Sequence, residues 1–288
     1  MVDAFAATQD AESAFITTTG TAGPGSHALF AEILQNDRID LSARVPEDYC
    51  LDITSRQLDQ CFQASSWLWQ DMLDLPSLAD ITSSLARNGA ISAAEQLRFK
   101  HERARFKHLR FAFAVFGSRH RYPMGIDAVT SVMGNLQDAF KNGIRPAIRR
   151  NAVLLNVLLR PLPMALVTRE IRRFEAASPE SLRRYMTRQA DAIHAFLRHE
   201  QVTAIAFHDT RKMVSRTRAF FVTMQTLFED PDVAGMADFV ACINGLMGNH
   251  HDGLMSASLH GTLDYHRDRF ELQPAIRERL QMLASALH

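Results

Sequence analysis

Residues 208–218 read HDTRKMVSRTR and residues 101–110 read HERARFKHLR, and these two basic stretches decide the fold. In both stretches the basic side chains recur at intervals of three or four residues, which places them along one face of an α-helix. Apolar side chains such as Phe106, Leu109 and Met213 fall on another face. Each stretch therefore predicts a helix that buries an apolar stripe and presents a cationic one.

A second pair of similar segments lies downstream of the basic stretches. Residues 132–140 read VMGNLQDAF and residues 246–254 read LMGNHHDGL. The shared motif residues are Gly134 and Asp138 in the first segment and Gly248 and Asp252 in the second. Aligning His101 with His208 offsets the basic stretches by 107 residues, whereas these segments are offset by 114, so the second copy holds seven more residues. We expect an internal duplication, with its motifs at about 91–160 and 200–270.

Helical spacing of apolar residues continues through most of the chain, and no segment alternates like a strand. Glycine (13) and proline (10) are scarce, which disfavours sandwiches and barrels with many tight turns. We therefore predict an all-α fold of tandem helical bundles over residues 50–288, with eight to ten helices and no sheet. The expected helices cover about 58–73, 77–87, 92–116, 124–141, 146–160, 179–198, 203–228, 233–247 and 252–270, with a last one from Pro274. Residues 1–49 are predicted to be a flexible acidic tail with one short helix from Ser26.

The charges are strongly segregated although the formal net charge is zero. Residues 1–88 hold 4 Lys and Arg against 13 Asp and Glu, residues 89–228 hold 24 against 10, and residues 229–288 hold 4 against 9. A basic middle between acidic ends predicts an anionic partner or a neutralising contact within the chain. Arginine provides 28 of the 32 basic side chains, and its planar fork of donors suits phosphate and carboxylate groups.

The cationic stripes are the candidate binding surface. On the first helix His101, Arg105 and His108 share a face, and on the second His208, Arg211, Lys212 and Arg218 do. If the duplication turns the two stripes toward each other, they line a positive groove that suits a polyanion with regularly spaced charges. Each arginine can give paired hydrogen bonds to a phosphate, and each histidine can add a donor at lower pH.

The second copy resembles the CHAD family, the conserved histidine α-helical domains, through His208-x-x-Arg211-Lys212-x-x-x-Arg216-x-Arg218 followed by Met247-Gly248-x-x-x-Asp252. In the first copy Ala104 stands where the family pattern has arginine, and Arg105 follows it. The resemblance implies tandem helical bundles around a basic central cavity that binds inorganic polyphosphate, without catalysis or a cofactor. It nominates as polyanion-binding residues His101, Arg105, His108, His208, Arg211, Lys212, Arg216 and Arg218. Asp138 and Asp252 suit the orientation of arginines or the capping of helices, since carboxylates repel phosphate.

Two other functions remain open. A metal-dependent phosphohydrolase of the HD type would use histidine and aspartate ligands around a divalent cation, and the chain offers His208, Asp209, His250, His251, Asp252, His260, Asp264, His266 and Asp268. Adjacent His250 and His251 point about 100° apart on a helix, so at most one of them faces a given site. Alternatively, the chain is a helical scaffold whose basic middle docks an acidic protein. A dense arginine run at 169–188 has no base-reading module beside it, so sequence-specific nucleic-acid binding is not expected.

The sequence predicts a cytoplasmic protein, and the CHAD resemblance implies that it is located on polyphosphate granules. Cys50, Cys61 and Cys242 form no CxxC pair and are expected to be buried thiols in a reducing compartment. No secretory signal is visible at the N-terminus. The most apolar stretch, residues 152–167, is interrupted by Arg160 and two prolines and is too short to span a bilayer.

Overall fold

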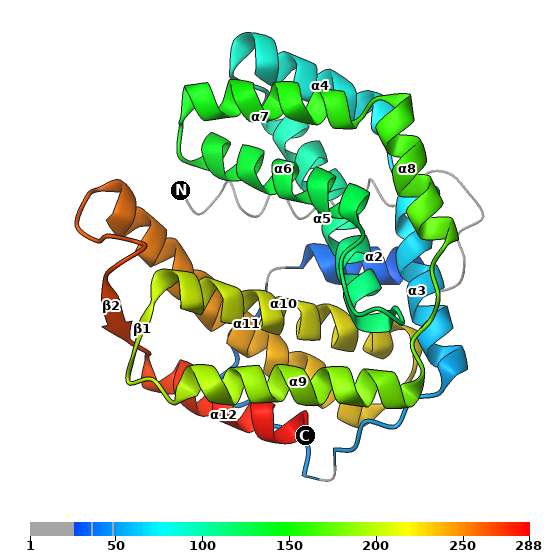
Figure 1. Cartoon of the computed structure of the whole chain (residues 1–288), viewed down its shortest axis with the longest axis vertical. Coiled ribbons are helices and arrows are strands. Elements are labelled where there is room, and N and C mark those ends of the chain that lie inside the picture. Colours follow the sequence, from blue (N-terminus) through cyan, green and yellow to red (C-terminus); the bar gives the residue numbers. More distant parts are fainter. Residues whose placement is uncertain (1–25, 36, 48) are drawn as a thin grey trace.

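The structure is a computed structural model that describes residues 26–35, 37–47 and 49–288. Over these residues it contains eleven helices and one two-stranded sheet (Figure 1). The elements are α2 (Ser26–Leu34), α3 (Ser55–Gln70), α4 (Leu75–Asn88), α5 (Ala93–Phe116), α6 (Met124–Lys141), α7 (Arg145–Leu158), α8 (Pro161–Arg172), α9 (Pro179–Leu197), β1 (Gln201–Thr203), α10 (Ala204–Leu227), α11 (Pro231–Leu259), β2 (Arg269–Glu271) and α12 (Pro274–Ala286). The prediction of a mostly helical protein is confirmed.

Capping hydrogen bonds and prolines determine where several of the helices begin. The Ser92 hydroxyl accepts from the Glu95 amide and the Glu95 carboxylate accepts from the Ser92 amide at 2.7 Å, which forms a capping box at the start of α5. Ser178 caps α9 in the same manner by accepting from the Ser181 amide. Proline occupies the first turn of α9, α11 and α12, where its missing N–H costs nothing.

The helices pack in two groups with the same pattern of neighbours. In the first group α5 packs against α6, and α4 packs against α7; in the second, α10 packs against α11, and α9 packs against α12. Helices α5 and α10 contact each other where the groups meet, between the upper and lower halves of Figure 1. The largest fully buried side chains are mainly aromatic and include Phe62, Phe106, Phe116, Phe207, Phe220, Phe221 and Phe239. Of these rings, Phe116 of α5 and Phe220 of α10 pack against each other at 5.7 Å, which stabilises the contact of the two groups.

Three details of the predicted fold are wrong. Residues Gln201–Thr203 pair antiparallel with Arg269–Glu271, so the described chain has a small sheet where none was expected. Three residues per strand are too few for an alternating pattern to stand out. The helix predicted at 233–247 runs without a break into the one predicted at 252–270, and this single helix, α11, ends at Leu259, so that residues 260–270 are not helical. The helix is continuous because its internal glycines cost only about 1 kcal/mol each and packing offsets that cost. Helix α8 was not foreseen because the prolines at its first turn read as breakers.

The chain before α3 is packed where the structure describes it, in contrast to the predicted flexible tail; residues 1–25 of that prediction lie outside the described residues. Leu29 and Phe30 of α2 are buried against α3, α5 and α10. Residues 37–47, here named the strap, lie along α11 and α12. Arg279 of α12 donates to the carbonyl oxygens of Leu41 and Ala43, at 2.5 and 3.0 Å. The strap is therefore held by specific bonds.

Two minor features complete the fold. Across the described ranges, no single helix has the length and apolar character needed to cross a bilayer; the pair α7 and α8, bent by 67° at its break, meets those criteria only when both helices are counted together. All three cysteines are free thiols, but only Cys61 and Cys242 are buried. Cys50 is exposed, so the expectation of three buried thiols is wrong for that residue.

Candidate anion-binding site between α5 and α10

A cavity of about 220 Å³ opens between α5 and α10 and is bounded by α2, α6, α11 and the strap. Four basic side chains line it: Lys100, Arg103 and Lys107 from α5 and Arg218 from α10. The carboxylate of Asp37, in the strap, is the one acidic group among the lining residues that the structure describes. Cations from both basic helices therefore line one shared hollow, which we name the basic cavity.

Arg103 and Arg211 occupy equivalent places in the two groups of helices. The Arg103 Nη2 atom lies 3.5 Å from the position that a Cβ atom would take at Gly134, and the Arg211 Nη2 atom lies 3.6 Å from the same position at Gly248. Both arginines thus extend over the glycine of a Met-Gly-Asn motif. This equivalence offsets the basic helices by 108 residues, one more than the alignment of His101 with His208.

The pKa of Lys107 reflects the positive charges that surround it. Burial is the largest cause that lowers the pKa of its ammonium group, and the charges of Arg103, Arg211 and Arg218 lower it further. The charge of Asp37 acts in the opposite direction. Together these effects bring the pKa to about 7. Three arginines from two helices therefore act on one lysine. Among the described residues neither Lys107, Arg103 nor Arg211 has a carboxylate within ion-pair distance. Concentrated positive charge with little compensation favours the binding of an anion.

An internal carboxylate already binds one of these cations. Asp37 forms an ion pair with Arg218, and its second oxygen accepts from the Asn244 amide. Ser215 fixes Asn244 in turn, because its hydroxyl donates to the Asn244 carbonyl oxygen at 2.8 Å. Part of the predicted neutralising contact between the acidic first segment and the basic middle is therefore present.

The aspartates of the repeated motif lie beside cations. Burial lowers the pKa of the Arg103 guanidinium, and the nearby charge of Asp138 opposes this shift. Asp252 of α11 accepts from the Lys141 ammonium of α6 at 2.9 Å, which joins the ends of these two helices. Asp252 therefore links α6 to α11, and Asp138 acts on Arg103 through its charge.

On α5, the predicted binding residues are mostly turned away from the basic cavity. Arg105 is buried beside Glu102, with which it pairs, and its guanidinium lies 4.2 Å from the centre of the Phe30 ring. The His101 ring also packs edge-on against Phe30 at 5.8 Å. His108 reaches the cavity wall, but its Nε2 atom lies 3.2 Å from both the Ser65 and the Thr223 hydroxyls. Burial, with the charges of Arg218 and Lys107, lowers its pKa to about 3, so it carries no charge near neutral pH.

On α10, the predicted set divides. Arg218 lines the basic cavity, and the charge of Arg211 acts on Lys107 there. The His208 ring packs against His251 at 4.9 Å, near the start of the helix. Lys212 is largely exposed and pairs with Asp209 at 3.2 Å. Arg216 points elsewhere, donating to the Tyr122 hydroxyl at 3.0 Å and to the Gln189 carbonyl oxygen at 2.9 Å.

The prediction missed Lys100, Arg103 and Lys107. One signal could have found Arg103: the spacing of Phe99, Arg103 and Arg110 repeats that of Phe207, Arg211 and Arg218. The structure supports this register, since Phe99 and Phe207 are both buried. Alignment on histidine instead shifted the predicted face of α5 by one residue, which is about 100° around a helix.

The histidines proposed as metal ligands do not gather in a group of three, although the His208 and His251 rings pack together. The His250 ring packs against Phe207 and Phe270 and lies 3.2 Å from the Gln273 amide, whereas the His251 Nε2 atom lies 3.2 Å from the Tyr265 hydroxyl. Within the described part of the chain, no group of three histidine, cysteine, aspartate or glutamate side chains could hold a metal ion.

Comparison of the chain with protein-family models, curated protein sequences and solved structures gives no match. The chemistry of the basic cavity therefore carries the functional argument.

Proposed function

We propose that this protein binds inorganic polyphosphate, or a polyanion of similar charge spacing, in the basic cavity, and that it does so without catalysis. Arg103, which lines the cavity, and Arg211, whose charge acts on Lys107, would each bind a phosphate unit from a different helix, since each guanidinium can give two parallel hydrogen bonds. Lys107 and Arg218 would add charge between them. A bound phosphate chain would neutralise several cations at once, which makes binding dependent on salt.

One observation carries this proposal: Lys100, Arg103 and Lys107 of α5 and Arg218 of α10 line one cavity, in which Asp37 is the one carboxylate among the described lining residues. A single carboxylate leaves most of that positive charge uncompensated. In this proposal Asp37 marks an anion position in the cavity, and a phosphate group competes with it for Arg218. The cavity holds about 220 Å³ with the strap in place, so a chain of several phosphates would displace the Asp37 side chain.

The packing of the helices supports a tandem repeat, although their sequences have diverged. The neighbours of α4–α7 match those of α9–α12, and Arg103 and Arg211 hold matching places over Gly134 and Gly248. In our proposal these are the two copies of a CHAD-like unit, and the basic cavity lies where they meet.

The test is titration of purified protein with long-chain polyphosphate at several salt concentrations. We expect Arg103→Ala/Arg211→Ala to weaken binding by at least about tenfold, because two charged hydrogen-bonding groups are lost. The slope of log K against log salt should also become shallower by about one to two. The matched control is Lys212→Ala, an exposed cation on the same helix, which should bind like the wild type.

Equal binding and an equal salt slope for the double variant and the wild type would refute this site. Circular dichroism and thermal unfolding check that the double variant is folded. If it is not, Arg103→Lys/Arg211→Lys keeps the charge without the planar fork, and intermediate affinity is then expected.

A peptide rich in aspartate or glutamate is a second candidate ligand, since the anion already at Arg218 is a protein carboxylate. A competition titration separates the two candidates. Displacement of polyphosphate by such a peptide at comparable concentration would favour an acidic protein partner, whereas failure to displace it favours the phosphate polymer.

A further inference from the structure

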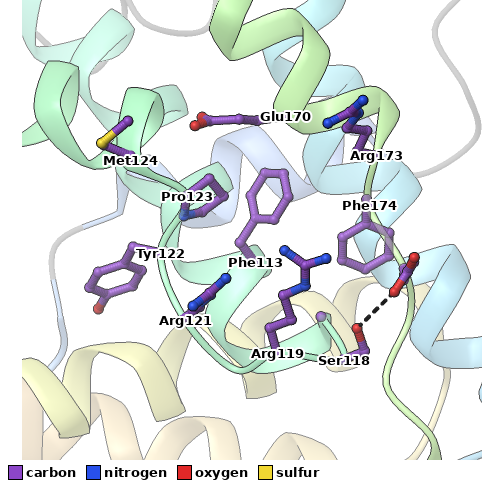
Figure 2. Close-up of a pocket in the computed structure, with 12 residues that line it drawn as sticks. Phe113, Ser118, Arg119, Arg121, Tyr122, Pro123, Met124, Glu170, Arg173 and Phe174 are labelled. Atoms are coloured by element: carbon purple, nitrogen blue, oxygen red, sulfur yellow. Dashed lines mark hydrogen bonds between the residues drawn. The ribbon is translucent and has the colours of Figure 1, made fainter.

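A larger cavity, of about 500 Å³, lies apart from the basic cavity and shares no lining residue with it. It is formed by residues 117–124, which join α5 to α6, and by the C-terminal end of α8 with the residues that follow (Figure 2). Arg119, Arg121 and Arg173 line it, and we name it the arginine pocket. Its size is within the range of about 300–1,000 Å³ that is usual for small-molecule sites.

The three guanidinium groups are available to a ligand. None of them forms an ion pair with another residue that the structure describes. Glu170 also lines the pocket, but its carboxylate is engaged at the start of α6, where it accepts from the Gly125 and Ile126 amides at 2.8 and 3.1 Å. Glu175 also lines the pocket and accepts from the Ser118 hydroxyl at 3.5 Å.

Aromatic and apolar side chains form the floor of the arginine pocket. Phe174 is stacked on Phe62, and the rings of Phe113 and Phe174 pack edge to face at 5.7 Å. Pro123 and Met124 complete this side (Figure 2). The pocket thus combines donors for an anionic group with a flat surface that suits a ring.

The loop that carries Arg119 and Arg121 is held in a strained conformation. His120, between them, has a positive φ of 45°, which side chains with a Cβ rarely adopt. Its two ring nitrogens lie 3.0 Å from the Ala114 carbonyl oxygen and the Ser181 hydroxyl, and the ring stacks on Tyr185 at 4.5 Å. Figure 2 shows Arg119 and Arg121 extending from this loop toward the space in front of Phe113. Strain of this kind persists where surrounding contacts over-determine it, often at ligand sites.

We infer that the arginine pocket is a second binding site, for a small phosphate ester that carries a flat ring, of which a nucleoside monophosphate is the simplest probe. The phosphate would lie between the Arg119 and Arg121 guanidiniums, with Arg173 across the pocket from them. The ring would lie on the apolar side formed by Phe174 and Pro123. Inorganic phosphate alone would leave that apolar side unused, so it should bind more weakly.

The experiment is calorimetric titration of the full chain with adenosine monophosphate, adenosine and inorganic phosphate. We expect saturable binding of the monophosphate, with adenosine and inorganic phosphate at least about tenfold weaker. Arg119→Ala/Arg121→Ala should lower affinity for the monophosphate by at least about tenfold, and Arg173→Ala should lower it less. The matched control is Arg172→Ala, the exposed neighbour of Arg173 that does not line the pocket, and it should bind like the wild type.

Failure of the wild type to bind the monophosphate at millimolar concentration, or equal binding by the double variant, would overturn this inference. Equal affinity for adenosine would also overturn it, because the phosphate group would then contribute nothing to binding by the arginines. If the double variant is misfolded, Arg119→Lys/Arg121→Lys keeps the charge and should still bind measurably more weakly than the wild type.

This inference does not depend on polyphosphate binding. Arg103→Ala/Arg211→Ala should leave affinity for the monophosphate within about twofold, and Arg119→Ala/Arg121→Ala should leave polyphosphate binding within the same range. Loss of monophosphate binding in the Arg103→Ala/Arg211→Ala variant would instead place that ligand in the basic cavity and contradict a second site.

Discussion

The carboxylate of Asp37 forms an ion pair with the guanidinium of Arg218, which joins the acidic first part of the chain to its basic middle. Both side chains are largely withdrawn from solvent, with exposed fractions of 20% for Asp37 and 15% for Arg218. Asn244 and Ser215 extend the contact into a chain of hydrogen bonds from the strap to α11 and α10. The strap therefore contributes both to stability and to the charge of the basic cavity.

The first prediction concerns Asp37→Asn. Without the ligand, the variant should be less stable by about 1–2 kcal/mol, because Arg218 loses the charged partner that compensates its partial burial. With the anionic competitor removed, affinity for polyphosphate should rise by about tenfold. Urea unfolding and polyphosphate titration at fixed salt measure the two effects. Asp40→Asn, in the same strap but outside the basic cavity, is the control. Weaker polyphosphate binding by Asp37→Asn would mean that Asp37 positions Arg218 for the ligand instead of competing with it.

The second prediction follows from the pKa of Lys107, which is about 7 in the folded, unliganded protein. A bound polyanion favours the charged ammonium, so at pH 8 the protein should take up a proton on binding, and its affinity should fall as pH rises from 7 to 9. Calorimetry in two buffers with different ionisation enthalpies measures the proton uptake. Lys107→Arg stays charged throughout this range and should show less uptake. Identical uptake by both proteins would place the titrating group elsewhere.

The third prediction concerns His108, whose folded-state pKa is about 3, below the value of about 6.5 for an unfolded chain. The unfolded state therefore binds a proton that the folded state does not, and this contribution to stability is lost as pH falls below 6.5. Between pH 7 and 5 the loss should be about 2 kcal/mol from this residue. His108→Gln should show a smaller fall in urea midpoint over that interval. His199→Gln, at an exposed position, is the control, and a fall as large in His108→Gln as in the wild type would contradict the assignment.

The fourth prediction compares two glycines of α11. A Cβ atom at Gly245 would lie 2.8 Å from Ile39 Cγ1 and 3.2 Å from the Asp37 carbonyl oxygen, whereas one at Gly253 would meet nothing within 4 Å. Gly253→Ala should stabilise the protein by about 0.5–1 kcal/mol, since alanine is the better helix former. Gly245→Ala should destabilise it by about 1–2 kcal/mol because the strap must shift. It should also increase polyphosphate affinity, since Asp37 moves with the strap. Equal stability of the two variants in urea would show that the strap is not held against α11.

Much of the helical framework could be predicted from local signals. Ser92, Ser178 and Pro274 mark helix starts at or next to the observed ends, because capping and proline effects act within one turn. The same local reasoning wrongly predicted an interruption of α11 next to Gly248, where the helix is continuous. A glycine only lowers the propensity for a helix, and the contacts of neighbouring helices decide whether the helix continues.

By itself, the sequence determined that the chain forms helices and that two of them carry dense cationic stripes, since both properties follow from residue type and a period of 3.6. It also identified Arg218, which lines the basic cavity, and Arg211, whose charge acts on Lys107 of that cavity. Only the tertiary structure decided which cations of α5 remain available. Helix α2 covers Arg105 with Phe30, whereas Arg103 and Lys107 line the basic cavity. Helical periodicity orders the side chains around one axis, but contacts between residues far apart in sequence choose the faces that are buried. The approach of Asp37 to Arg218 is such a contact, and no local pattern encodes it.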